Sequence, residues 1–76
     1  PYTQRHKDAC RALEIQYHAS KADITAAYAR LKAKHEAALA EADKYRLDGY
    51  EEEKKYLNED FAEVTDFYNA FMASKD

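Results

Sequence analysis

The residues from 23 to 42 constrain the fold most, because they carry one apolar stripe and contain neither Gly nor Pro. Apolar side chains that recur every three or four residues predict one buried face of an α-helix. No helix-breaking residue follows before Gly49, so we expect this helix to continue far past residue 38. The stripe consists of Ile24, Ala27, Tyr28, Leu31, His35, Leu39 and Ala42.

A shorter helix is expected before this stretch, over about residues 7–17. Cys10, Leu13 and Tyr17 form its apolar stripe, and Ile15 lies beside it. A helix of about 10 residues is not stable alone in water, so it must dock on the rest of the chain.

Two sequence patterns set the ends of the second helix, which we expect over about residues 22–47. Ser20 followed three residues later by Asp23 is typical of an N-terminal cap. Gly49 is expected to end the second helix in the left-handed conformation. Asp48 is then expected to cap a third helix over about residues 50–72.

The third helix carries large apolar residues on one face at close to heptad spacing. Because a tight turn joins it to the second helix, the two helices must pack antiparallel. The chain is therefore expected to form a single all-α domain over residues 1–76, with a long helical hairpin and a short helix docked at its open end. This register places Tyr28 near Tyr68 and His35 near Phe61. Tyr45, Tyr50 and Tyr56 are expected to add packing to the hairpin rather than to form a recognition patch. The apolar face of the third helix consists of Tyr50, Leu57, Phe61, Val64, Tyr68 and Phe71.

Charge and composition exclude several classes of protein. Fifteen acidic residues against twelve basic ones leave a net charge of −3, which gives no support for nucleic-acid binding. No apolar run reaches the roughly 18 residues of a membrane span, so we expect no membrane contact by this domain itself. The single cysteine, Cys10, excludes an internal disulfide and favours a reducing intracellular compartment. The chain begins at Pro1, which is compatible with a domain excised from a longer protein.

Residue types that carry catalysis do not occur in useful combinations. The sequence has no nucleophile–base pair and no phosphate-binding Gly loop, so we expect neither enzymatic activity nor a cofactor. His6 and Cys10 are four residues apart and share one side of a helix. Because no second pair of ligands lies close in sequence, we expect no metal site.

Two blocks of sequence follow a known helical pattern. Residues 8–31 contain, without a gap, a short first helix ending in an apolar pair, an Ala-Ser turn and an Asp-Ile-x-x-Ala-Tyr-x-x-Leu helix. Residues 61–71 match the third helix of the same pattern. Together they resemble the J-domain, the module with which DnaJ-type co-chaperones engage a DnaK-type chaperone ATPase, and this resemblance implies a J-domain-like fold. The matched positions of the first block are Asp8, Leu13, Ile15, Ala19, Ser20, Asp23, Ile24, Ala27, Tyr28 and Leu31.

The motif that the family needs for activity is absent from the chain. The second helix of a J-domain ends in a His-Pro-Asp loop that is required to stimulate ATP hydrolysis, and these positions fall here on Glu36, Ala37 and Ala38. His35 lies one residue early and has no Pro or Asp after it. A Pro-containing loop ends a helix, whereas Glu-Ala-Ala continues one. Glu14 also stands where the family usually has Gly.

The candidate partner-binding residues are Arg30, Lys32, Lys34 and His35 of the second helix. In the family, the positions of Arg30 and Lys34 often carry positive charges that meet an acidic surface of the chaperone. Residues 21–35 hold four basic residues against one acidic residue, a net of +3, and residues 48–66 hold eight acidic residues against two lysines, a net of −6. One basic and one acidic flank favour a charged protein partner or self-association. A solvated helix face remains the alternative.

The resemblance implies a non-catalytic J-like module that does not stimulate a DnaK-type ATPase. Its partner would be another J-domain protein, a DnaK-type chaperone or a client, in a homo- or hetero-dimer. The J-like subunit of the mitochondrial import motor is a precedent in the family, so the implied compartments are the cytoplasm and the matrix side of mitochondria. Two alternatives stay open: a structural hairpin within a larger assembly, and an active co-chaperone that uses His35 in a rearranged loop.

Overall fold

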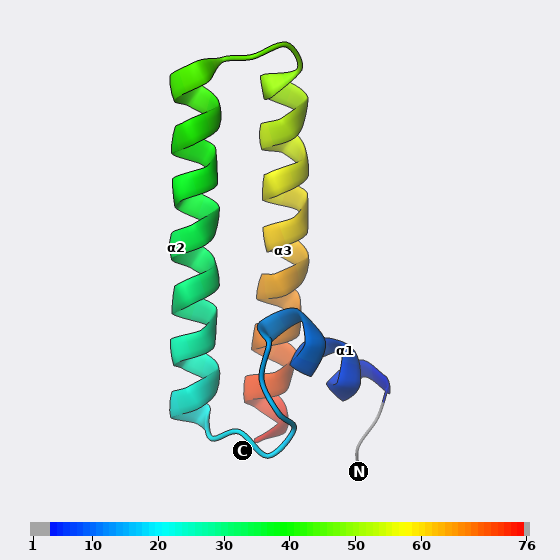
Figure 1. The fold of residues 1–76 in the computed structure, drawn as a ribbon. Helices are drawn as coiled ribbons and strands as arrows, with labels where there is room; N and C mark the ends of the chain where they lie inside the picture. The colour runs from blue at the N-terminus through cyan, green and yellow to red at the C-terminus, as the bar shows by residue number, and fades with distance from the viewer. Residues whose placement is uncertain (1–3, 76) are drawn as a thin grey trace.

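Three α-helices make up the fold in the computed structural model, which describes residues 4–75. They are α1 (Gln4–Leu13), α2 (Lys21–Tyr45) and α3 (Tyr50–Ser74). The helices α2 and α3 run antiparallel as a long hairpin, and α1 packs near its open end, where the chain also finishes (Figure 1). The described part of the chain is therefore all-α and elongated, with extents of 45 × 21 × 15 Å.

The start of α2 has the cap that its sequence predicts. The backbone N–H of Asp23 donates to Ser20 Oγ at 3.1 Å, and the backbone N–H of Ser20 donates to Asp23 Oδ2 at 3.3 Å. These reciprocal bonds form a capping box, and the Asp23 carboxylate lies at the positive end of the helix dipole. The predicted N-terminal cap is confirmed.

The first helix begins and ends earlier than its apolar pattern predicts, at Gln4 and Leu13 instead of residues 7 and 17. It ends because Glu14 takes the left-handed conformation, with φ 58°. The N–H of Ile15 then donates to the Cys10 carbonyl at 3.0 Å, and that of Glu14 donates to the Arg11 carbonyl at 3.3 Å. These two bonds make a Schellman motif, which turns the chain away from the helix before Tyr17.

The turn at the hairpin tip also differs from the prediction. The second helix ends at Tyr45, because Arg46 is left-handed with φ 48° and its N–H donates to the Ala42 carbonyl at 2.9 Å. Gly49 does have a positive φ of 82°, but it lies at the N-cap of α3 and not at the end of α2. The expectation that Asp48 caps α3 is therefore wrong, and α3 begins without a side-chain cap. At its other end, α3 continues two residues past the predicted Met72.

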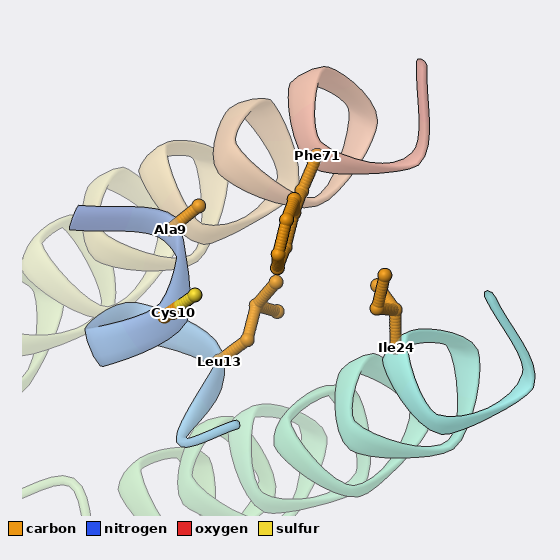
Figure 2. Packing of buried hydrophobic residues seen from close by; sticks show 5 residues of the cluster. All are labelled: Ala9, Cys10, Leu13, Ile24 and Phe71. Carbon is orange, nitrogen blue, oxygen red and sulfur yellow. The ribbon is translucent and has the colours of Figure 1, made fainter. Parts of the chain in front are cut away.

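The core lies where all three helices meet. Leu13 of α1, Ile24 of α2 and Phe71 of α3 are its largest fully buried side chains. Figure 2 shows Leu13 and Phe71 pointing toward each other, with Ile24 beside them. Ala9 and Cys10 of α1 complete this cluster. The first helix, which is too short to be stable alone, thus docks at the open end of the hairpin.

A column of aromatic rings joins α2 to α3 above this core. Tyr28 stacks on Tyr68 with ring centroids 4.1 Å apart and on Phe61 at 5.3 Å, and His35 stacks on Phe61 at 4.6 Å. The Tyr28 hydroxyl also lies 2.9 Å from Thr65 Oγ1, within hydrogen-bond distance. These contacts confirm the predicted antiparallel register.

Burial decreases from the open end of the hairpin toward its tip. Ile24 and Phe71 are at most 1 % exposed, whereas Leu57 is only half-buried. Tyr45 and Tyr56 are 57 % and 66 % exposed, so the expectation that they pack into the hairpin is wrong. The physical reason is the place of α1, which crosses the hairpin at its open end and leaves the tip without a covering helix in the described part of the chain (Figure 1).

We expect Glu14→Gly to stabilise the fold. A side chain with a Cβ costs about 1–2 kcal/mol in the left-handed region, and Gly carries no such penalty. The free energy of unfolding should rise by about 1 kcal/mol, which corresponds to an increase in Tm of about 4–8 °C for a domain of this size. Urea unfolding measures the change in free energy and thermal unfolding the change in Tm, both followed by circular dichroism. Glu14→Ala keeps the Cβ and should show no comparable gain, and a loss of stability in Glu14→Gly would contradict the role of this position.

Candidate partner-binding surface

The three basic residues predicted to bind a partner do not lie on one face of α2. Arg30 and Lys34 are four residues apart, so they lie on the same side of the helix. Lys32 is two residues from each of them and therefore lies on roughly the opposite side. All three side chains are exposed. The structure thus reduces the predicted basic face to Arg30 and Lys34.

Arg30 borders a hollow between α2 and the loop that follows α1. The hollow has a volume of about 350 Å³. Its loop side exists because α1 ends at Leu13, which leaves residues 15–19 as a loop beside α2. This loop contains a turn in which the N–H of Ala19 donates to the Gln16 carbonyl at 3.0 Å. The hollow thus brings an apolar side chain, the Arg30 guanidinium and the Asp23 carboxylate close together. Its lining residues are Ile15, Gln16, His18, Ala19, Asp23, Ala26 and Arg30.

Lys34 and His35 belong to a second hollow, a groove of about 290 Å³ between α2 and α3. His35 is half-buried there, with its ring nearly parallel to Phe61 at an interplanar angle of 10°. The ring of His35 is thus held by packing, while Lys34 remains at the exposed rim. The groove is lined by Leu31, Lys34, His35, Ala38, Leu57, Asp60, Phe61 and Val64.

The three positions at which the resemblance places a His-Pro-Asp loop are helical. Glu36, Ala37 and Ala38 lie in the middle of α2, which is continuous from Lys21 to Tyr45. Glu36 and Ala37 are exposed, and Ala38 is half-buried against the groove. The backbone therefore makes no turn after His35.

The acidic residues of α3 lie on more than one side of the helix. Glu53 and Asp60 border hollows shared with α2. Glu52 and Glu59 border a separate hollow of about 230 Å³ on α3 itself, beside Tyr56. The predicted acidic flank is therefore divided between the hairpin groove and the outer surface of α3.

The residues considered for metal binding have other contacts. Cys10 is buried in the core, and the His6 ring lies 5.6 Å from Tyr17 and 5.9 Å from Phe71, measured between centroids. No group of three or more His, Cys, Asp or Glu side chains within residues 4–75 could hold a metal ion.

Sequence reasoning missed two parts of this surface. The loop side of the Arg30 hollow was missed because residues 15–17 were assigned to the first helix. Leu47 is 70 % exposed near Tyr45 at the hairpin tip. It is exposed because α1 packs at the other end of the hairpin (Figure 1). The end of α1 at Glu14 has no local sequence signal, because Glu is not a residue typical of a helix end. The exposure of Leu47 has no local signal either.

Comparisons with models of known protein families, with curated proteins and with solved structures gave no match. None of the helices in the described part of the chain has the length and apolar character needed to cross a membrane.

We expect Ala37→Pro to destabilise the fold strongly. Pro in a helix interior removes a hydrogen bond and clashes with the preceding turn, which costs about 3 kcal/mol or more. Ala37→Ser, at the same exposed position, should cost only about 0.5 kcal/mol. Chemical denaturation of both variants measures the difference. A well-tolerated proline would show that the chain can turn after His35, in contrast to the continuous helix.

Proposed function

We propose that this chain is a degenerate J-like domain that binds a protein partner and does not stimulate the ATPase of a DnaK-type chaperone. The observation that carries this proposal is the uninterrupted helix through Glu36, Ala37 and Ala38. These are the positions at which an active J-domain would leave its second helix.

The arrangement of the three helices supports the J-like part of the proposal. A short helix docks at the open end of an antiparallel hairpin, which is the arrangement that the sequence resemblance implies (Figure 1). Leu13, Ile24 and Phe71 are matched positions of the two sequence blocks, and they are also the three largest fully buried side chains. The resemblance and the core therefore depend on the same residues.

The course of the backbone supports the inactive part of the proposal. The second helix continues from Ala38 to Tyr45, which is about 10 Å at 1.5 Å per residue. The side chains at 36–38 thus project from a straight helix at successive angles and cannot converge as in a loop. His35 cannot replace the missing histidine without giving up its stack on Phe61.

The exposed basic pair defines the chemistry of the partner. Arg30 and Lys34 lie on one side of α2, where they can meet an acidic surface of another J-domain protein, a DnaK-type chaperone or a client. Complementary charges of this kind set association rate and specificity more than affinity. Such a domain would act by occupying or positioning its partner, as one half of a hetero- or homo-dimer.

A structural role within a larger assembly is the second candidate. It is favoured by the hairpin tip, where Tyr45 and Leu47 are 57 % and 70 % exposed. Large exposed apolar side chains that lie close together mark interaction surfaces. In this case the hairpin would serve as a scaffold and the basic pair would be a solvated surface.

An ATPase assay tests the central proposal. We expect the domain, at saturating concentration, to leave the single-turnover rate of ATP hydrolysis by a DnaK-type chaperone at its basal value. An active J-domain with an intact His-Pro-Asp loop serves as the positive control. Clear stimulation of the chaperone ATPase by this chain would contradict the proposal that the domain is inactive.

Charge reversal separates the two candidates. We expect Arg30→Glu and Lys34→Glu each to weaken binding to the chaperone, because each replaces an attraction to an acidic surface by a repulsion. Lys32→Glu makes the same change in charge on the other side of α2 and should leave binding unchanged. Binding is measured by biolayer interferometry and folding by circular dichroism. Equal affinity for all three variants would favour the scaffold.

A further inference from the structure

The groove that holds Lys34 and His35 continues to the tip of the hairpin. It adjoins a second hollow of about 190 Å³, and Ala38 lines both. The second hollow extends along α2 to Tyr45 and includes Leu47 of the turn. The two hollows thus follow one another between α2 and α3 and meet at Ala38, and together we call them the tip groove.

The tip groove begins where the core around α1 ends. Leu31 and Val64 pack against the core cluster that holds α1, and both also line the groove. From Leu31 to Tyr45 the groove follows fifteen residues of α2, a rise of about 21 Å. A helix of about 14 residues fits this length. The hairpin already packs against one helix at its open end, namely α1, which lies across the hairpin beside α3 (Figure 1).

The apolar side chains of the tip groove are only partly covered. Phe61 and Leu57 are half-buried, whereas Phe71, which α1 covers, is 1 % exposed. At the far end of the groove Tyr45 and Leu47 are mostly exposed. A third apolar helix laid along the groove would remove these side chains from water, as α1 does for the core.

The rims of the tip groove carry mainly negative charge. Among its lining residues, Glu41, Glu53 and Asp60 are exposed carboxylates and Lys34 carries the one positive charge. At the far end, Lys44 lies over the Tyr45 ring and Arg46 over the Tyr50 ring. The excess of acid that a docked helix meets is therefore along the middle of the groove, between Lys34 and Tyr45. Basic residues on both sides of its apolar stripe would complement this pattern, and acidic residues there would be repelled.

We propose that the tip groove binds an amphipathic helix of a partner protein, with an apolar stripe flanked by Lys or Arg. This surface differs from the Arg30 hollow. Binding at the tip groove does not depend on the J-like function, since a scaffold could use the same groove. A second copy of this chain fits less well, because its groove would present the same excess of acid.

A pair of designed peptides tests the charge preference. Each is an amidated helix of about 14 residues with a Leu stripe, flanked by Lys in one peptide and by Glu in the other. We expect the Lys peptide to bind at least about tenfold more tightly, a difference of about 1.4 kcal/mol. In NMR spectra of the labelled domain it should shift amide signals around Leu57 and Phe61. Equal binding of both peptides, or shifts confined to another face, would overturn the proposal.

Two variants with the same change in charge locate the site. Ala38→Arg fills the floor of the groove and opposes a basic helix, so we expect it to weaken binding of the Lys peptide about tenfold or more. Ala37→Arg lies outside the groove and should bind as the wild type does. If Ala38→Arg fails to fold by circular dichroism, Glu53→Lys combined with Asp60→Lys reverses the rim charge and should have the same effect.

Sedimentation equilibrium tests whether a second copy of this chain, instead of a partner helix, occupies the tip groove. We expect the tip groove to be free of a second copy in the wild-type chain without the peptide, so Ala38→Arg should leave the apparent mass unchanged. A dimer that Ala38→Arg dissociates, and from which the Lys peptide is excluded, would assign the groove to a second copy and overturn the proposed occupant. None of these measurements involves a chaperone, so their failure is distinct from failure of the J-like function.

Discussion

The contact between Leu13, Ile24 and Phe71 is the interaction on which the rest of the structure depends. A helix as short as α1 does not persist alone, and a hairpin of two helices leaves one face open to water. Complete burial of each such side chain contributes about 1.5–3 kcal/mol, a large share of the stability of a small domain. Because α1 covers only the open end, the Arg30 hollow forms beside its following loop and the tip groove forms beyond it.

The parts of the fold that follow from side-chain periodicity could be predicted from the sequence. The hairpin, its register and the Ser20–Asp23 capping box agree with the structure, because each depends on residue spacing alone. The ends of α1 and α2 could not be predicted. Glu14 and Arg46 adopt positive φ, which local preference assigns to Gly, and the one glycine of the turn begins α3 instead. Both residues are exposed, and at each of them backbone hydrogen bonds close the end of the helix.

The candidate surface was less accessible to sequence reasoning than the fold. Arg30, Lys32 and Lys34 alternate along the chain and look like one basic patch, yet the helical repeat separates Lys32 from the other two. The tip groove depends on where α1 packs along the hairpin, which only the assembled fold shows (Figure 1). The exposure of Tyr45 and Tyr56 has the same origin, so neither residue could be assigned from composition.

The hydrogen bond between Tyr28 and Thr65 has a consequence for how the two long helices align. Their apolar stripes repeat at similar intervals, so hydrophobic contact alone distinguishes poorly between neighbouring alignments that differ by one turn, about 5.4 Å. The bond is partly buried, and Thr65 Oγ1 lies within reach of the tyrosine hydroxyl in the observed alignment. A slide by one turn would break this bond, and a typical hydrogen bond contributes about 0.5–1.5 kcal/mol. The polar pair thus favours the same alignment as the short turn between the helices and adds directional preference to an otherwise repetitive interface.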